Sequence, residues 1–223
     1  LSRMRGGAKI ILHVLGLSCV LVAMDLLTGF HRWSVNWAIP ILTVVATLLL
    51  TVLVFAKKML WNAYIGYAPV TNAEYAAFKA DFVYDADKEN YPVVNITIAE
   101  ATAYCDWLTA QDNVHTYRLP TDEEWVLGAG HMPKDVVMNA GRVESGLTAV
   151  DAYSQSTGAC GGIDFWGNCW EWTSSTDANG RYIVKGGAWD SKRDDCRSEK
   201  SDDVRIGTQG YANIGFRVVR TDF

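Results

Sequence analysis

The sequence predicts an α+β, loop-rich domain preceded by a transmembrane α-helical hairpin. Three observations indicate this class. Two long apolar runs with few charged residues lie within residues 1–56. Amphipathic helical patterns with N-cap residues follow them, and the chain after Gly130 alternates short apolar strings with Gly, Asn, Asp and Ser, as short strands joined by loops do. We therefore divide the chain into a hairpin, residues 1–58, and a domain, residues 59–223.

The hairpin consists of two predicted helices, residues 10–30 and 37–56. At 1.5 Å per helical residue, each run is long enough to cross the hydrocarbon core of a bilayer. The alternative is a cleaved signal peptide followed by a buried core helix. A signal peptide has a shorter apolar stretch and a small-residue cleavage site, so we favour two membrane-spanning helices.

Four residues in this region have a predicted relation to the membrane. His13 and Asp25 lie inside the first run, where ionisable groups are costly. Either Asp25 lies near the far interface and His13 is neutral, or both residues contact neighbouring transmembrane subunits. Trp33 and Trp37 lie near the helix ends, where indole rings commonly reside at the headgroup level.

Basic residues lie outside both ends of the predicted hairpin, namely Arg3, Arg5, Lys9, Lys57 and Lys58. Because cytoplasmic flanks of membrane helices are enriched in Lys and Arg, both ends are expected in the cytoplasm. We therefore expect an integral protein of the bacterial inner membrane whose soluble domain faces the cytoplasm.

The charge balance excludes one class of partner. The net charge is −5, and residues 1–56 contribute four bases and one acid, which leaves −8 for the rest of the chain. Nucleic acid binding needs clustered Lys and Arg, so no nucleic acid partner is expected.

The cysteines do not have the spacing of a structural zinc site. Cys105, Cys160, Cys169 and Cys196 of the domain form no CxxC pair. In the cytoplasm they should be reduced thiols, whereas in an oxidising compartment one or two disulfides could form. Cys105 is most simply a core residue.

Three helices are predicted in the domain. The segment from Thr71 to Phe82 begins with an N-cap and a glutamate three residues later. A second helix begins near Ile98, and a third begins at Thr121 and ends by Gly130. The strings RYIVKGGAW and IGFRVV then predict short strands.

Six sequence motifs in the domain resemble those of a known family. They are PVTNAEYAAF, YPVVNITIAEATAYCDWL, YRLPTDEEW, GNCWEWTSS, VKGGAWDS and NIGFRVVR. In this order they resemble the formylglycine-generating enzyme, or sulfatase-modifying factor, family. The resemblance implies a C-type-lectin-like α+β fold from about residue 62 onward.

The resemblance also implies where the family's chemistry would lie. Its oxidase uses two thiolates after the Gly-Gly turn, which bind copper(I). In this chain the two equivalent positions are Ser191 and Cys196. A serine hydroxyl is a poor ligand for copper(I), so we expect no catalytic residues and no copper, unless an oxidase uses a rearranged site.

Family members bind calcium around the GNxWEW motif, which places a candidate calcium site at Asn168 and Glu171. Hard cations prefer carboxylate and carbonyl oxygens. The alternative is that Asn168 and Glu171 form hydrogen bonds within the loop while the neighbouring tryptophans fill the core. We expect no obligatory cofactor.

A mixed-charge surface near the expected family cleft is a candidate for protein contacts, since Arg and Trp are enriched where proteins dock. Its predicted residues are Trp189, Asp190, Arg193, Arg197, Arg205 and Arg217. A solvated face with local ion pairs is the alternative.

These observations favour a non-catalytic, membrane-anchored accessory or scaffold subunit of a bacterial membrane protein complex. Its expected partners are other transmembrane subunits and the lipid bilayer. One alternative is a membrane-bound, copper-dependent formylglycine-generating oxidase that acts on a peptide cysteine. The other is a ligand-binding sensor domain.

Overall fold

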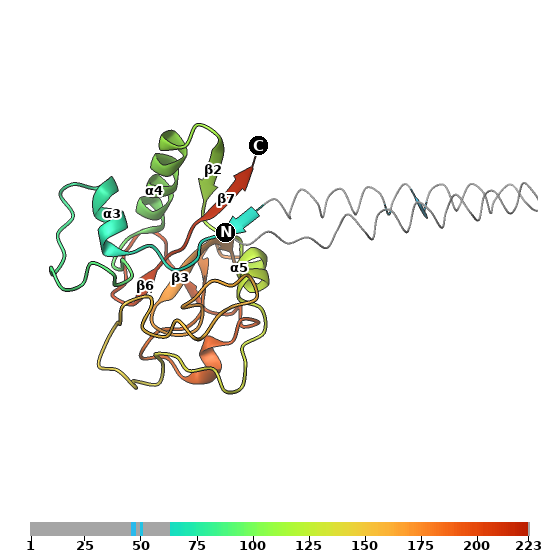
Figure 1. The fold of residues 1–223 in the computed structure, drawn as a ribbon. Coiled ribbons are helices and arrows are strands. Elements are labelled where there is room, and N and C mark those ends of the chain that lie inside the picture. Colours follow the sequence, from blue (N-terminus) through green and yellow to red (C-terminus); the bar gives the residue numbers. More distant parts are fainter. Residues whose placement is uncertain (1–45, 48–49, 51–62, 223) are drawn as a thin grey trace, which may run out of the picture. The chain divides into compact units, whose positions relative to one another are not determined.

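A computed structural model describes residues 46–47, 50 and 63–222 (Figure 1). Residues 46, 47 and 50 are helical. The other positions of the predicted spans at 10–30 and 37–56 lie outside the described residues, as do the membrane residues His13, Asp25, Trp33 and Trp37. Among the described residues, no helix combines the length and the apolar character that a membrane crossing requires. The hairpin therefore stays a prediction.

The first of two small sheets joins the beginning and the end of the described domain. Its three antiparallel strands are ordered β1 (Ala63–Ile65), β7 (Val219–Asp222) and β2 (His115–Arg118). Ala63 lies opposite Thr221, and Thr116 lies opposite the same residue on the other side. The central strand is thus the last one in the chain (Figure 1).

The second sheet has four strands, ordered β5 (Val204–Arg205), β4 (Tyr182–Lys185), β3 (Trp170–Thr176) and β6 (Ile214–Gly215). The β3–β6 pair is parallel and the other pairs are antiparallel. The two predicted strand strings are confirmed, since the first forms β4 and the second forms β6 and the start of β7. A short 3-10 helix, η1 (Arg193–Cys196), lies between β4 and β5.

All three helices of the domain begin with the same arrangement of capping hydrogen bonds. They are α3 (Asn72–Phe78), α4 (Ile98–Gln111) and α5 (Asp122–Ala129). In each, an N-cap threonine accepts a hydrogen bond from the backbone of a glutamate three residues later, whose carboxylate accepts from the N-cap backbone. This capping box satisfies two backbone donors that the first turn leaves unpaired. The predicted helix starts at Ile98 and Thr121 are confirmed.

The predicted helix from Thr71 to Phe82 is shorter than expected, because α3 ends at Phe78 and Lys79 adopts an extended conformation. The backbone N–H of Phe82 then donates to the Lys79 carbonyl at 2.9 Å. This turn still brings the Phe82 ring to 5.0 Å from the Tyr75 ring, edge to face. The aromatic contact that suggested a longer helix is therefore made by a turn.

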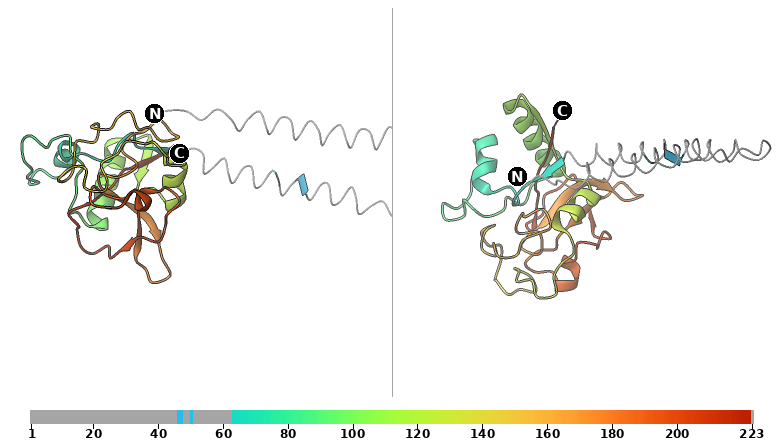
Figure 2. Two further views of the ribbon diagram at one scale, coloured as in Figure 1. Left: turned by 90° about the horizontal axis from the view of Figure 1, so that it is seen from below. Right: turned by 45° about the vertical axis from the view of Figure 1, so that its right-hand side comes forward.

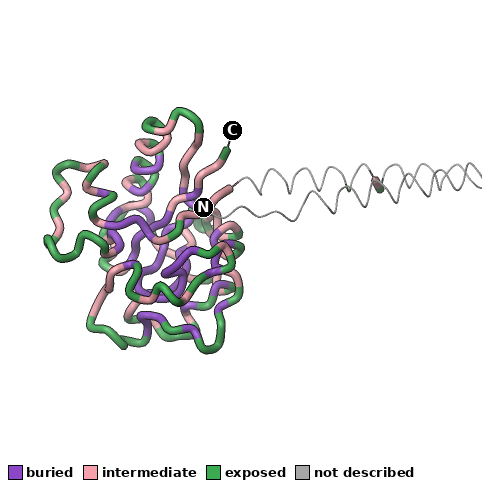
Figure 3. The backbone as a smooth tube through the Cα atoms, in the orientation of Figure 1, coloured by how far each residue is buried: buried purple, intermediate pink, exposed green. Residues whose placement is uncertain are grey.

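Two clusters of buried residues form the core, and Figure 3 shows which parts of the backbone are buried. The larger packs α3 and α4 against both sheets around Tyr75, Tyr104 and Trp172. The smaller lies around Trp125 and Phe165. Residues 130–169, which connect α5 to β3, contain no regular helix or strand and run as loops (Figure 2). The predicted loop-rich α+β organisation is confirmed for the described domain.

The capping boxes generate a stability prediction. Thr97→Ala removes the hydroxyl that accepts from the Glu100 N–H at 3.2 Å and donates to its carboxylate at 3.0 Å. We expect unfolding in urea, followed by tryptophan fluorescence, to show a loss of about 1 kcal/mol. Thr102→Ala is the matched control, because this exposed hydroxyl bonds only to the Ile98 carbonyl within the helix. Equal losses for the two variants would contradict the capping role.

Candidate functional site

The segment after the glycine pair, where the resemblance places the family chemistry, forms a tight turn. The Ser191 hydroxyl accepts a hydrogen bond from the Ala188 N–H at 3.0 Å, and the Ser191 N–H donates to the Ala188 carbonyl at 2.9 Å. The Ser191 carbonyl in turn accepts from the Gly141 N–H at 2.7 Å. Ser191 therefore closes a turn and joins it to a neighbouring loop.

The second equivalent position, Cys196, lies inside the smaller core cluster. Its side chain is fully buried, and its Sγ lies 3.6 Å from the Lys192 carbonyl, to which the thiol donates. Gly187, with φ of +76°, packs directly against it, so that any side chain at this position would collide with Cys196. Burial raises the pKa of the Cys196 thiol to about 12.

This donor set does not fit copper(I). Copper(I) prefers soft sulfur ligands, and of the two equivalent positions Cys196 alone carries a sulfur, which is fully buried. Burial likewise raises the pKa of Cys105 to about 12 and that of Cys169 well above its usual value. Ser191 offers a hydroxyl, which already accepts a hydrogen bond from the Ala188 N–H in the turn.

The centre of the domain is a buried ion pair between Arg217 and Glu171. The guanidinium donates to the two carboxylate oxygens at 2.6 Å each, and both side chains are completely buried. Trp125 Nε1 donates to Glu171 Oε2 at 2.7 Å. The prediction that Arg217 belongs to an exposed recognition surface is wrong, because this ion pair holds its side chain inside the core.

Asn168, the other predicted calcium residue, holds a separate network. Its side-chain oxygen accepts from the Thr148 N–H at 2.9 Å, and its side-chain nitrogen donates to the Thr148 carbonyl at 3.1 Å. The same nitrogen donates to the Asp164 carboxylate at 2.7 Å. Asn168 and Glu171 therefore have different partners, although they are three residues apart.

The predicted calcium pair does not fit as a pair, because both Glu171 oxygens face the positive guanidinium of Arg217. Other hard oxygen ligands lie around Asn168. Asp164 is buried, and desolvation raises the pKa of its carboxyl to about 8. Asn139 is also buried, and its Oδ1 has no hydrogen-bond partner among the described residues. Asp164 and Asn139 are thus the residues that could contact a calcium ion here.

Two of the predicted interaction residues are engaged by backbone groups. The Arg193 guanidinium donates to the carbonyls of Val136, Pro133 and Lys134 at 2.9, 3.2 and 2.7 Å, and thereby fixes the loop after α5. Trp189 is half-buried, and its carbonyl accepts from the Arg142 N–H at 2.8 Å.

The remaining interaction residues differ in exposure. Asp190 is exposed and accepts from Asn213 Nδ2 at 3.3 Å. Arg197 is exposed and pairs with Asp194 at 2.9 Å. Arg205 is half-buried, with its guanidinium 5.9 Å from the Trp170 ring centroid. Of the predicted set, the exposed residues are Asp190, Arg193 and Arg197.

Sequence reasoning missed Asn139 and Asp164, because they lie in irregular loops without a periodic pattern. One signal was present in the residue types. Asp164 and Asn168 both adopt positive φ, at 57° and 60°, a conformation that Asp and Asn tolerate better than other non-glycine residues. Their four-residue spacing next to Gly167 is consistent with two such turns.

Comparison with known families gives two matches. Residues 55–222 match the family described as the Sulfatase-modifying factor enzyme 1-like domain. Residues 1–73 match DUF6320, a family of unknown function. A mouse (Mus musculus) protein named inactive C-alpha-formylglycine-generating enzyme 2 is 27% identical over 162 residues, which cover 59% of this chain and 49% of the relative. The chain thus spans about half the length of this curated relative.

Three solved structures share the fold. PvdO from Pseudomonas aeruginosa has a TM-score of 0.61 at 20% identity, covering 70% of this chain and 79% of its own. CarF has a TM-score of 0.59 at 20% identity, covering 71% and 86%. Treponema denticola variable protein 1 has a TM-score of 0.58 at 17% identity, covering 70% and 84%. At these identities the likeness establishes the mixed helix-and-strand fold.

The central ion pair generates a prediction about stability. Arg217→Met leaves the Glu171 carboxylate buried without its countercharge, so we expect a loss of about 3–5 kcal/mol in chemical denaturation. The double variant Glu171→Leu/Arg217→Met should recover part of this loss, because it removes both buried charges. Arg197→Met is the control, since this pair is exposed and contributes about 0–1 kcal/mol. A double variant less stable than Arg217→Met would contradict this account.

The buried carboxyl generates a prediction about pH. The pKa of Asp164 in the folded state is about 8, above its usual value of 3.8, so the folded state binds a proton that the unfolded state releases. This group therefore lowers the free energy of unfolding as pH rises from 4 to 8. We expect Asp164→Asn, measured at pH 5, 6, 7 and 8 with a chelator present, to flatten that decline. An unchanged slope would rule out Asp164 as its source.

Proposed function

The chain belongs to the sulfatase-modifying factor enzyme 1-like family, and we propose that it is a non-catalytic member of that family. In this proposal it is an accessory or scaffold subunit of a bacterial membrane protein complex. Residues 10–30 and 37–56 anchor it in the inner membrane, and the domain, a C-type-lectin-like fold, contacts other subunits on the cytoplasmic side.

One observation carries the non-catalytic part of the proposal. At the two positions equivalent to the family's copper ligands, Ser191 closes a turn with its hydroxyl and Cys196 lies fully buried in the core. Two accessible thiolates are needed for copper(I) chemistry of this kind, and neither position offers one. The name of the mouse relative describes that protein as inactive, which is compatible with the same situation here.

The subunit role is supported by the chain outside the described domain. Two apolar runs of membrane-crossing length precede the domain, and the first contains His13 and Asp25. Ionisable groups at such positions commonly face other protein segments. On the domain, exposed Asp190 and Arg197 offer charged groups to a partner, together with half-buried Trp189.

The non-catalytic assignment predicts the outcome of an activity assay. The full chain in detergent should not convert the cysteine of a sulfatase-type peptide to formylglycine when copper(I) and oxygen are supplied, as followed by mass spectrometry. The oxidase alternative would instead show turnover that disappears in Cys196→Ala and persists in Cys105→Ala. Cys105 is the matched control, because its thiol is equally buried and has a similarly raised pKa.

The subunit assignment predicts a stoichiometric complex. The tagged full chain, solubilised from its native membrane in a mild detergent, should elute with other membrane proteins at constant ratio in size-exclusion chromatography. A monodisperse chain without partners would refute the scaffold role. Binding of one glycan or peptide class on an array by that solitary chain would favour the sensor alternative.

A further inference from the structure

A groove lies beside helix α4. It consists of two adjoining cavities of about 680 and 240 Å³. Ile98 of α4 and Tyr182 of β4 line both cavities, so the two cavities adjoin at these side chains. The opposite wall of the larger cavity comes from the turn that connects β3 to β4, the start of β4 and the residues after β5. The opposite wall of the smaller cavity comes from the end of β2, from Leu119 and from Ser174 of β3, besides Tyr182. The groove lies apart from Ser191 and Cys196, neither of which lines it.

The larger cavity has an apolar wall that packs against Gly207. Ile98 and Tyr182 are half-buried, and Ile206 leaves 56% of its surface exposed. A Cβ atom at Gly207 would lie 2.7 Å from both Ile98 and Tyr182. Because real Cβ contacts are longer than this, glycine at this position allows the chain after β5 to lie directly against these two side chains. An aliphatic or aromatic side chain is the group that such a wall accommodates.

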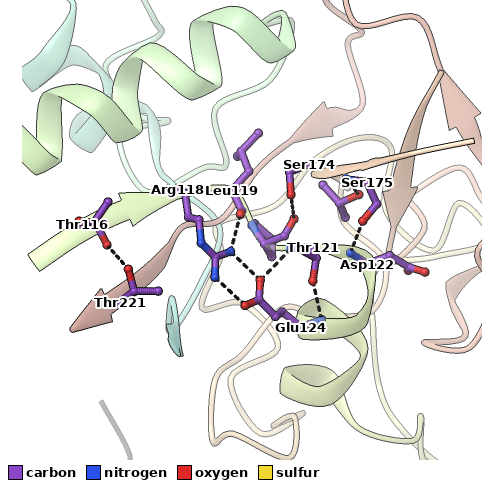
Figure 4. Close-up of polar contacts among 11 residues, drawn as sticks. Thr116, Arg118, Leu119, Thr121, Asp122, Glu124, Ser174, Ser175 and Thr221 are labelled. Carbon is purple, nitrogen blue, oxygen red and sulfur yellow. Dashed lines mark hydrogen bonds and ion pairs between the residues drawn. The ribbon is translucent and has the colours of Figure 1, made fainter. Parts of the chain in front are cut away.

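The charges around the groove are paired with one exception. Arg118 is held by Glu124 through two hydrogen bonds of 2.6 Å (Figure 4). Arg181 pairs with Asp177 at 2.7 Å. Asp106 is exposed and lines the smaller cavity, and it forms no ion pair with any described residue. The charge that the groove offers to an occupant is therefore a carboxylate.

The spacing of these features defines the length of an occupant. Ile98, Thr102 and Asp106 follow one another at four-residue intervals along α4, so the first and last are about 12 Å apart along the helix axis. An extended chain covers this distance in about four residues. An apolar side chain beside Ile98 would thus be followed, about four residues away, by a group beside Asp106.

We propose that this groove binds an extended segment of a partner subunit that carries an aliphatic or aromatic residue and, about four residues away, a Lys or Arg. The apolar residue contacts Ile98, Tyr182 and Ile206, and the cation pairs with Asp106. The partner's identity as a membrane subunit rests on the proposed function. Cytoplasmic ends of membrane helices place Lys and Arg next to apolar residues, and the acidic domain favours such a segment.

The test uses a defined probe on the full chain in lipid nanodiscs. The probe is the fluorescein-labelled peptide acetyl-Ser-Trp-Ser-Gly-Ser-Lys-Ser-amide, followed by fluorescence anisotropy. We expect saturable binding that weakens at least about tenfold in Asp106→Lys and in Ile206→Asp. Replacing the peptide Lys by Glu, or its Trp by Ser, should have a similar effect.

Two exposed positions outside the groove supply matched controls. Asp87→Lys makes the same charge change at an exposed aspartate, and Val83→Asp makes the same apolar-to-acidic change at a side chain that is 88% exposed. Both should bind the probe like the unmodified chain. Three outcomes would contradict the proposed binding at the groove. They are no binding of the probe up to about 1 mM, equal weakening in groove and control variants, and equal binding of the Glu peptide.

The failure of this inference is distinguishable from that of the proposed function. If partner subunits co-purify with Asp106→Lys and Ile206→Asp as they do with the unmodified chain, the groove is not their docking site and the scaffold role stands. If the probe binds as expected while the unmodified chain has no partners in its membrane, the groove stands and the scaffold role fails.

Discussion

The buried pair of Arg217 and Glu171 is the interaction on which the rest of the domain depends. The guanidinium reaches the carbonyls of Gly66, Ile163 and Asp164 as well as the carboxylate, and its plane lies over the Phe165 ring at 3.6 Å. One side chain near the end of the chain thus joins the segment after β1, a loop and β3. Because a buried charge without its partner is strongly unfavourable, these segments can pack only in a way that keeps the pair intact.

Polar groups are also satisfied in the segment after the glycine pair, where the resemblance places the family chemistry. Gly187 allows the chain to approach Cys196 so closely that the thiol becomes part of the core. The hydroxyl of Ser191 then satisfies a backbone N–H in the turn. Both equivalent positions are therefore engaged in hydrogen bonds and packing within the domain. The motif around β3 is structural in this domain, because Trp172 is buried and Glu171 forms the central ion pair.

Charged groups in the described domain separate into two sets with different consequences. Arg193 and Lys185 form their hydrogen bonds within the domain. Arg193 donates to the Val136 carbonyl, and Lys185 Nζ donates to the Lys200 carbonyl at 2.5 Å and pairs with Asp122 at 2.9 Å. These residues hold irregular segments that have no sheet ladder of their own. Asp106, in contrast, has its charge available beside an open groove. The groove beside α4 thus presents a carboxylate without an ion-pair partner among the described residues, whereas Ser191 and Cys196 are engaged within the domain.

The sequence by itself determined the local structure: the starts of α4 and α5, the strands β4 and β6, the loop-rich segment and the family. A capping box joins residues three apart, so its signature is visible in a short window. Tertiary structure decided that α3 ends at Phe78, that Arg217 is buried and that Asp164 faces Asn168. Arg217 and Glu171 are 46 residues apart. Whether a charged residue lies in solvent or in the core depends on such distant partners, and no local pattern records them.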